Sequence, residues 1–128
     1  MKHYFFSILL CLLTIPLFSF GQKAPIITFE NKACDFGTVK YRPKSVIKIK
    51  FYYTNTGNAP LVIYKVDSSC ECTVPNWTKK PIIPGKKDYI LLTFKMNGKR
   101  GIVQKSIFVN TNTDEKVTVL HIKGEIIS

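Results

Sequence analysis

The stretch VIKIKFYYT, residues 46–54, is the clearest secondary-structure signal in this 128-residue chain. Alternate side chains of an extended strand point to opposite faces. One face would carry large apolar side chains only, namely Ile47, Ile49, Phe51 and Tyr53. The other would carry Lys48, Lys50, Tyr52 and Thr54. This alternation predicts a strand with one buried and one solvent-exposed face, as is typical of antiparallel sheets.

The same period of two returns along the rest of the chain, and no window after residue 21 shows the period of an amphipathic helix. Runs rich in Asn, Gly and Pro, such as residues 55–60 and 84–88, predict turns between the strands. The predicted strands are residues 26–30, 34–39, 46–54, 61–66, 89–94, 102–110 and 116–127. Seven short strands without a helix predict an all-β, immunoglobulin-like β-sandwich formed by a single domain, residues 22–128.

The N-terminal segment MKHYFFSILLCLLTIPLFSFG, residues 1–21, has the pattern of a signal peptide. Lys2 precedes an apolar run, and Ser19 and Gly21 supply small residues before a cut at Gln22. A retained transmembrane anchor is the alternative, but Pro16 and the small residues at the end of the run argue against it. We therefore expect export to the periplasm or the cell surface, with no membrane span after cleavage.

The formal net charge is +11, or +10 once Lys2 is removed with the leader. Such a charge attracts anionic partners through long-range fields. The lysines are scattered, however, and no long block of like charges appears. We expect a solvated basic surface rather than a dedicated polyanion site, and no nucleic-acid partner, because export removes most nucleic acid from reach.

The chain resembles a known bacterial family in the order and spacing of its sequence blocks. These blocks are FENKACDFGTV, FYYTNTGNAPLVIYKV, SSCECTVPNW, KPIIPGKKDYILLTF, GIVQKSIFVNTN and LHIKGEI, and together they cover about residues 28–126. The family is known as domain of unknown function 1573. The resemblance implies an exported Ig-like sandwich, similar in style to major sperm protein and to the ASH domains of cilia and centrosomes, with no activity common to its members.

The family's usual block S-C-G-C-T is matched by Cys70, Cys72 and Thr73, whereas Glu71 replaces the glycine. The replacement implies that this position needs no positive φ here. Cys34 stands where the family pattern leads us to expect a polar residue or His. A disulfide that used Cys34 would therefore be particular to this chain.

Cys34, Cys70 and Cys72 allow three kinds of chemistry. A soft metal ion, copper or zinc, could bind Cys70 and Cys72 with Cys34 or His121 as third ligand, although zinc sites favour a longer spacing. A Cys70–Cys72 disulfide needs a local bend, because alternate Cα atoms of a strand lie about 6.6 Å apart, near the limit for a disulfide. Such a bond would be strained and prone to exchange. Alternatively, Cys34 bonds Cys70 or Cys72 and ties the N-terminal segment to the middle of the sandwich.

Other catalytic constellations are absent from the sequence after the leader. His121 is its sole histidine, no serine lies between glycines, and the acidic residues are dispersed over different elements. We therefore expect no catalytic residues, no cofactor and no bound metal.

Trp77, the only tryptophan, lies in a predicted loop after the cysteine pair. An exposed loop Trp could be a binding hot spot. The simpler interpretation is that it caps one end of the core beside the cysteines, because Trp is well buried on average. Trp77, Lys79, Lys80 and Glu71 form the candidate binding surface.

From these observations we expect an exported, non-enzymatic binding or envelope-associated module. Its partner would be a protein or another envelope component. The alternative is a thiol-dependent redox protein or a soft-metal protein that uses Cys70 and Cys72.

Overall fold

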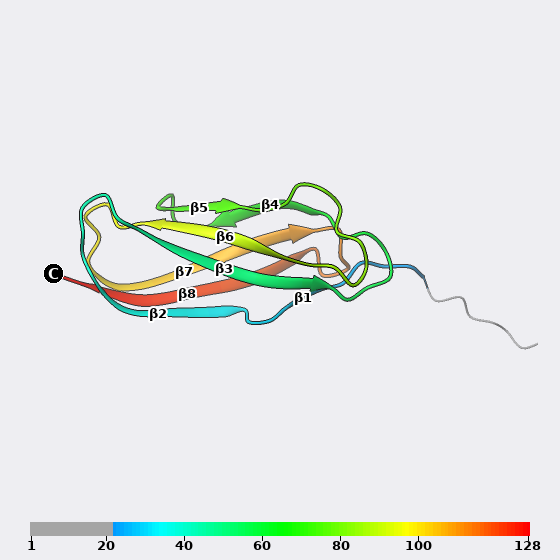
Figure 1. Cartoon of the computed structure of the whole chain (residues 1–128), viewed down its shortest axis with the longest axis horizontal. Helices are drawn as coiled ribbons and strands as arrows, with labels where there is room; N and C mark the ends of the chain where they lie inside the picture. Colours follow the sequence, from blue (N-terminus) through cyan, green and yellow to red (C-terminus); the bar gives the residue numbers. More distant parts are fainter. Residues whose placement is uncertain (1–21) are drawn as a thin grey trace, which may run out of the picture.

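The computed structural model describes residues 22–128, which form two four-stranded sheets packed face to face (Figure 1). The strand order is β1-β3-β6-β5 in one sheet and β2-β8-β7-β4 in the other. The strands are β1 (Ile27–Phe29), β2 (Ala33–Lys40), β3 (Val46–Asn55), β4 (Ile63–Ser68), β5 (Thr73–Asn76), β6 (Lys87–Lys95), β7 (Gly101–Thr111) and β8 (Val117–Ile127). This confirms the predicted all-β, Ig-like sandwich. The predicted signal peptide, residues 1–21, lies outside the described residues.

The described part of the chain contains no helix that is long and apolar enough to cross a membrane.

The alternation predicted for residues 46–54 is confirmed in β3. Ile49, Phe51 and Tyr53 are buried, and the intervening side chains are exposed or half-buried. Strand β6 pairs with β3 in antiparallel register, with Phe51 opposite Ile90. The facing sheet completes the core with buried side chains of β7 and β8, namely Val103, Ile107, Val109, Leu120, Ile122 and Ile126. The core is therefore centred on the four central strands, two from each sheet, and the outer strands add Phe29 of β1 and Ile63 and Val66 of β4.

One strand, β5, was not predicted from the sequence. It has four residues, includes Pro75, and pairs only with β6 at the edge of its sheet. Proline lacks a backbone donor and is tolerated on edge strands, where one side of the ladder is free. Four residues with a proline are too few to show the alternation of apolar and polar side chains from which the other strands were predicted.

Strand β2 contains an irregularity at Gly37. Its register with β8 shifts between Asp35 and Thr38, and Gly37 has a φ of 75°. Phe36 is half-buried and packs against the core, over Gly124 of β8. A Cβ atom on Gly124 would overlap the Phe36 ring, so this glycine leaves the space that the ring occupies.

Asn55, at the end of β3, is the hydrogen-bond centre of one end of the sandwich and is fully buried. Its Nδ2 donates to the carbonyl oxygens of Ala59 and Ile82, both at 2.8 Å. Its Oδ1 accepts from the backbone N–H of Gly57 at 3.0 Å. Asn55 therefore joins the β3–β4 turn to the segment that leads from β5 to β6.

Candidate functional site

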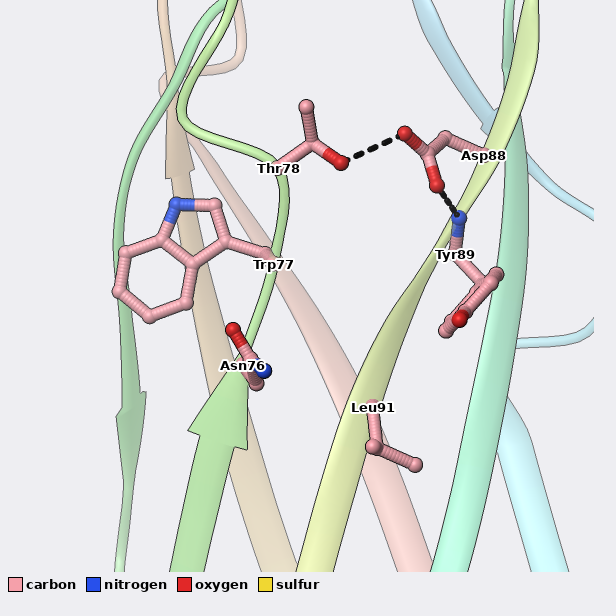
Figure 2. Close-up of a pocket in the computed structure, with 6 residues that line it drawn as sticks. All are labelled: Asn76, Trp77, Thr78, Asp88, Tyr89 and Leu91. Atoms are coloured by element: carbon pink, nitrogen blue, oxygen red, sulfur yellow. Dashed lines mark hydrogen bonds between the residues drawn. The ribbon is translucent and has the colours of Figure 1, made fainter.

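A shallow pocket of about 180 Å³ lies where the chain leaves β5 and diverges from β6. Figure 2 shows the residues that line it on its two sides: Asn76, Trp77, Thr78, Asp88, Tyr89 and Leu91. The hydroxyl of Thr78 donates to Asp88 Oδ2 at 2.7 Å, and the N–H of Tyr89 donates to Asp88 Oδ1 at 2.7 Å. Because both of its oxygens accept hydrogen bonds within the protein, Asp88 joins the two sides of the pocket.

Trp77 follows β5 directly and is half-buried. Its ring packs against the main core, and its Nε1–H donates to the carbonyl oxygen of Ile63 in β4 at 3.2 Å. The ammonium of Lys79 lies 2.8 Å from the ring centroid. Trp77 therefore packs on the core, with Lys79 over the ring, but at the opposite end of β5 from the cysteines, beside which the cap was predicted.

An aromatic pair lies on the outer face of β3 and β6, beside this pocket. Tyr52 and Tyr89 are directly opposite each other in the register, are each 38% exposed, and have ring centroids 5.6 Å apart. The ammonium of Lys50 lies 4.8 Å from the Tyr89 centroid, and that of Lys87 lies 5.1 Å from the Tyr52 centroid. Lys87 also pairs with Glu30. We call Tyr52, Tyr89, Lys50 and Lys87 the tyrosine–lysine face.

Sequence reasoning missed the tyrosine–lysine face, although part of the signal was present. The alternation in residues 46–54 places Lys50 and Tyr52 on the outer side of β3. The contribution of β6 depends on register, because only the pairing of Tyr52 with Tyr89 brings the rings together. Register between strands far apart in sequence is set by packing and turns, not by either strand alone.

At the other end of β5, Cys70 and Cys72 form a disulfide, with their Cα atoms 5.2 Å apart. The chain turns here, and the N–H of Thr73 donates to the carbonyl oxygen of Cys70 at 3.2 Å. This turn is the bend that the sequence analysis required for such a bond. Cys70 is half-exposed and Cys72 is buried.

The alternative in which Cys34 bonds Cys70 or Cys72 is wrong, because Cys34 is a free thiol in β2. Strands β2 and β4 are the two edges of one sheet, and Cys70 follows the end of β4. Three strand spacings of about 4.8 Å place these edges about 14 Å apart, far beyond the reach of a disulfide. Burial, and secondarily the charge of Asp35, raise the pKa of the Cys34 thiol.

The candidate binding residues do not form one continuous surface. Glu71 lies in the cysteine turn before β5, whereas Trp77, Lys79 and Lys80 follow the other end of that strand. Lys79 and Lys80 are exposed. The structure thus divides the predicted surface into two regions separated by the length of β5.

His121, the candidate third metal ligand, lies on β8, and its Nδ1 is 3.5 Å from the hydroxyl oxygen of Ser106. Within residues 22–128, no three His, Cys, Asp or Glu side chains form a group that could hold a metal ion. The two sulfurs of Cys70 and Cys72 are bonded to each other and are not thiolates in this form.

Several solved structures have a similar fold. A protein of unknown function from Porphyromonas gingivalis W83 has a TM-score of 0.69 and 16% identity over 85% of this chain and 51% of that chain. Domain 7 of human CEP192, an ASH/PapD-like domain, has a TM-score of 0.65 and 11% identity over 84% of this chain and 89% of that chain. The secreted serine protease VesC from Vibrio cholerae has a TM-score of 0.58 and 10% identity over 78% of this chain and 23% of that chain.

These identities show a shared fold and nothing more specific. The chain spans about half of the length of the Porphyromonas gingivalis protein. A search of the curated proteins finds no match. The family model described as "Protein of unknown function (DUF1573)" matches residues 27–126, which is most of the chain. The match confirms the resemblance seen in the sequence blocks, and the chain therefore belongs to the DUF1573 family, within an Ig-like, PapD-like fold.

Proposed function

We propose that this protein is an exported, non-enzymatic binding module that contacts an acidic protein partner through the tyrosine–lysine face. The observation that most supports this proposal is the exposed Tyr52–Tyr89 pair, with Lys50 and Lys87 beside the rings. Tyrosine offers a large, rigid and amphipathic contact area at low entropic cost, and it is enriched among residues that dominate binding energy.

The position of the two tyrosines also favours a binding role. Both lie on paired strands near the middle of their sheet, so the backbone is already ordered before a partner arrives. A preordered surface loses less conformational entropy on association than a mobile loop does. The adjoining pocket at Trp77 and Asp88 gives a partner side chain a shallow recess.

The lysines favour a partner with acidic groups. Lys50 and Lys87 flank the rings, and Lys79 and Lys80 follow Trp77 after β5, with Lys79 over the Trp77 ring. Complementary charge speeds encounter and selects partners more than it adds affinity. Glu71 lies at the far end of β5, so we leave it out of this contact surface.

Export is supported by two independent features. The leader pattern of residues 1–21 is that of a signal peptide. The Cys70–Cys72 disulfide is of a kind that persists in oxidising compartments. We propose that the module works in the periplasm or at the cell surface.

A photo-crosslinking experiment in living cells tests the binding surface. A crosslinking amino acid replaces Tyr52 in one variant and Tyr64 in another; Tyr64 is 65% exposed on β4 of the other sheet and serves as the matched control. We expect a discrete adduct from position 52 and none from position 64. The Tyr52→Ala/Tyr89→Ala variant should lose the same partner in salt-sensitive pull-downs, while Tyr64→Ala should retain it. Equal adducts at both positions, or undiminished capture by the double variant, would contradict the proposal.

A further inference from the structure

The disulfide between Cys70 and Cys72 joins residues that are separated only by Glu71. The stabilisation that a disulfide gives by restricting the unfolded chain grows with the length of the loop that it closes. This bond closes a loop that contains a single intervening residue, and it connects no distant elements. Holding the sandwich together is therefore a weak explanation for its presence.

The two sulfurs differ in accessibility. Cys72 is 7% exposed and belongs to the buried cluster that also contains Phe94 and Met96. Cys70 is half-exposed at an open hollow of about 460 Å³ that Glu71, Cys72, Asn97 and Lys99 also line. A thiol that approaches from solvent reaches the sulfur of Cys70 first.

Two donors point at the sulfur of Cys70. The ammonium of Lys99 lies 3.3 Å from Cys70 Sγ, and the backbone N–H of Cys72 lies 3.2 Å from the same atom. Positive charge and N–H groups favour a thiolate over a thiol. The surroundings of Cys70 therefore stabilise the thiolate that forms on this sulfur when a mixed disulfide with a substrate is resolved.

The loop that places Lys99 is fixed by its own contacts. The N–H of Lys99 donates to the carbonyl oxygen of Met96 at 2.7 Å, and the N–H of Gly98 donates to the Tyr41 hydroxyl at 3.1 Å. The guanidinium of Arg100 lies 4.0 Å from the centroid of the same Tyr41 ring. The residues on both sides of Lys99 thus contact Tyr41, and the backbone of Lys99 is bonded to Met96, the residue directly after β6.

We propose that Cys70–Cys72 is a thiol–disulfide exchange site for paired cysteine thiols of other proteins, with Cys70 as the sulfur that forms the mixed disulfide. Lys99 is a positioning residue that stabilises the Cys70 thiolate. This activity is independent of the tyrosine–lysine face, which lies toward the other end of β5.

The exchange proceeds in two balanced steps. A substrate thiolate attacks Cys70 Sγ; a substrate–Cys70 bond forms, the Cys70–Cys72 bond breaks, and its electron pair leaves on Cys72 Sγ, which takes a proton. The second substrate thiolate then attacks the substrate sulfur of the mixed disulfide and releases the Cys70 thiolate next to Lys99. The substrate dithiol has lost two electrons and two protons, and Cys70–Cys72 has become a dithiol.

The test uses the full chain with Cys11→Ser and Cys34→Ser, which leaves only the pair of interest. The probe is a reduced peptide with two cysteines, and the readouts are the rate of peptide oxidation and the mass of the trapped mixed disulfide. In the additional Cys72→Ser variant, we expect oxidised glutathione to label Cys70. Lys99→Met should slow peptide oxidation about threefold, because without the ammonium the Cys70 thiolate is less stabilised and leaves the mixed disulfide more slowly. Lys48→Met, on an exposed site of β3, is the matched control and should not change the rate.

Circular dichroism checks that each variant is folded. If Cys72→Ser does not fold, the comparison of Lys99→Met with Lys48→Met in the disulfide-bonded protein still decides the question. Peptide oxidation no faster than that by the same concentration of oxidised glutathione would overturn the proposal. A rate that is insensitive to Lys99→Met would also overturn it. Reaction with reduced glutathione but not with the peptide would overturn the assignment of protein thiols as substrate.

Discussion

Replacing Asn55 with alanine should destabilise the whole sandwich, because one buried side chain joins two backbone segments that are distant in sequence. The variant loses the hydrogen bonds to Ala59 and Ile82, both 2.8 Å long, and the hydrogen bond from Gly57, which is 3.0 Å long. Each hydrogen bond of this kind contributes about 1 kcal/mol net. We therefore expect Asn55→Ala to lower the free energy of unfolding by about 3 kcal/mol, a large part of the roughly 5–15 kcal/mol typical of a domain.

Urea unfolding measures this loss, with the fluorescence of the single tryptophan, Trp77, as the signal. For a urea dependence of about 1.5 kcal/mol per molar, the midpoint should fall by about 2 M at unchanged slope. Asn110→Ala, at a half-buried position on β7, is the matched control and should change the midpoint little. A loss for Asn55→Ala within about 0.5 kcal/mol of this control would refute the reasoning, since such a change is typical of surface substitutions.

Asn55→Asp separates hydrogen bonding from side-chain size. The introduced carboxylate would face the carbonyl oxygens of Ala59 and Ile82, which accept hydrogen bonds from the amide in the natural chain. Burial and these oxygens disfavour the charged form, so the folded-state pKa of the introduced carboxyl group should rise above the usual value of about 3.9. A raised pKa means that stability is retained below about pH 4 and lost as the pH rises through the folded-state value. The same unfolding experiment at about pH 4 and about pH 7 should show this loss relative to the natural protein.

Three further substitutions test other parts of the structure. Gly124→Ala should cost about 1–3 kcal/mol in urea unfolding, because its Cβ would overlap the Phe36 ring, and the cost should shrink in a Phe36→Ala background. Burial and the charge of Asp88 raise the pKa of Tyr53 from 10.0 to about 12. The free energy of unfolding of the natural protein should therefore fall on the order of 2–3 kcal/mol between about pH 10 and about pH 12. Tyr53→Phe should reduce this pH dependence, and an unchanged dependence in the variant would contradict the assignment. Trp77→Phe removes the donor to Ile63 and should lower stability by about 1–2 kcal/mol in thermal unfolding followed by circular dichroism; an unchanged midpoint would argue against the capping role.

The strands with one buried face were predictable because each contains its own signal. Residues 46–54 alternate over four apolar positions, and the inward residues of β6, β7 and β8 follow the same rule. By contrast, β5 was missed, because a four-residue edge strand with Pro75 has too short a pattern. Its existence depends on pairing with β6, which is a tertiary contact.

The cysteine chemistry shows the same division. The sequence narrowed the chemistry to three cysteines and indicated that a Cys70–Cys72 bond needs a bend. It did not indicate that Cys34 lies on the opposite edge of the sheet from the strand that precedes Cys70. Nor did the spacing of residues reveal that Lys99, 29 positions away from Cys70, places its ammonium beside that sulfur.

By itself, the sequence determined the fold class, the family, the leader pattern and the buried faces of the long strands, because these depend on local periodicity and on blocks read in order. Only the tertiary structure decided which edges the cysteines occupy, that Tyr52 contacts Tyr89, and that Asn55 joins two distant segments. These features depend on strand order and register, which arise when two sheets pack their apolar faces together, and no single stretch of the chain specifies them.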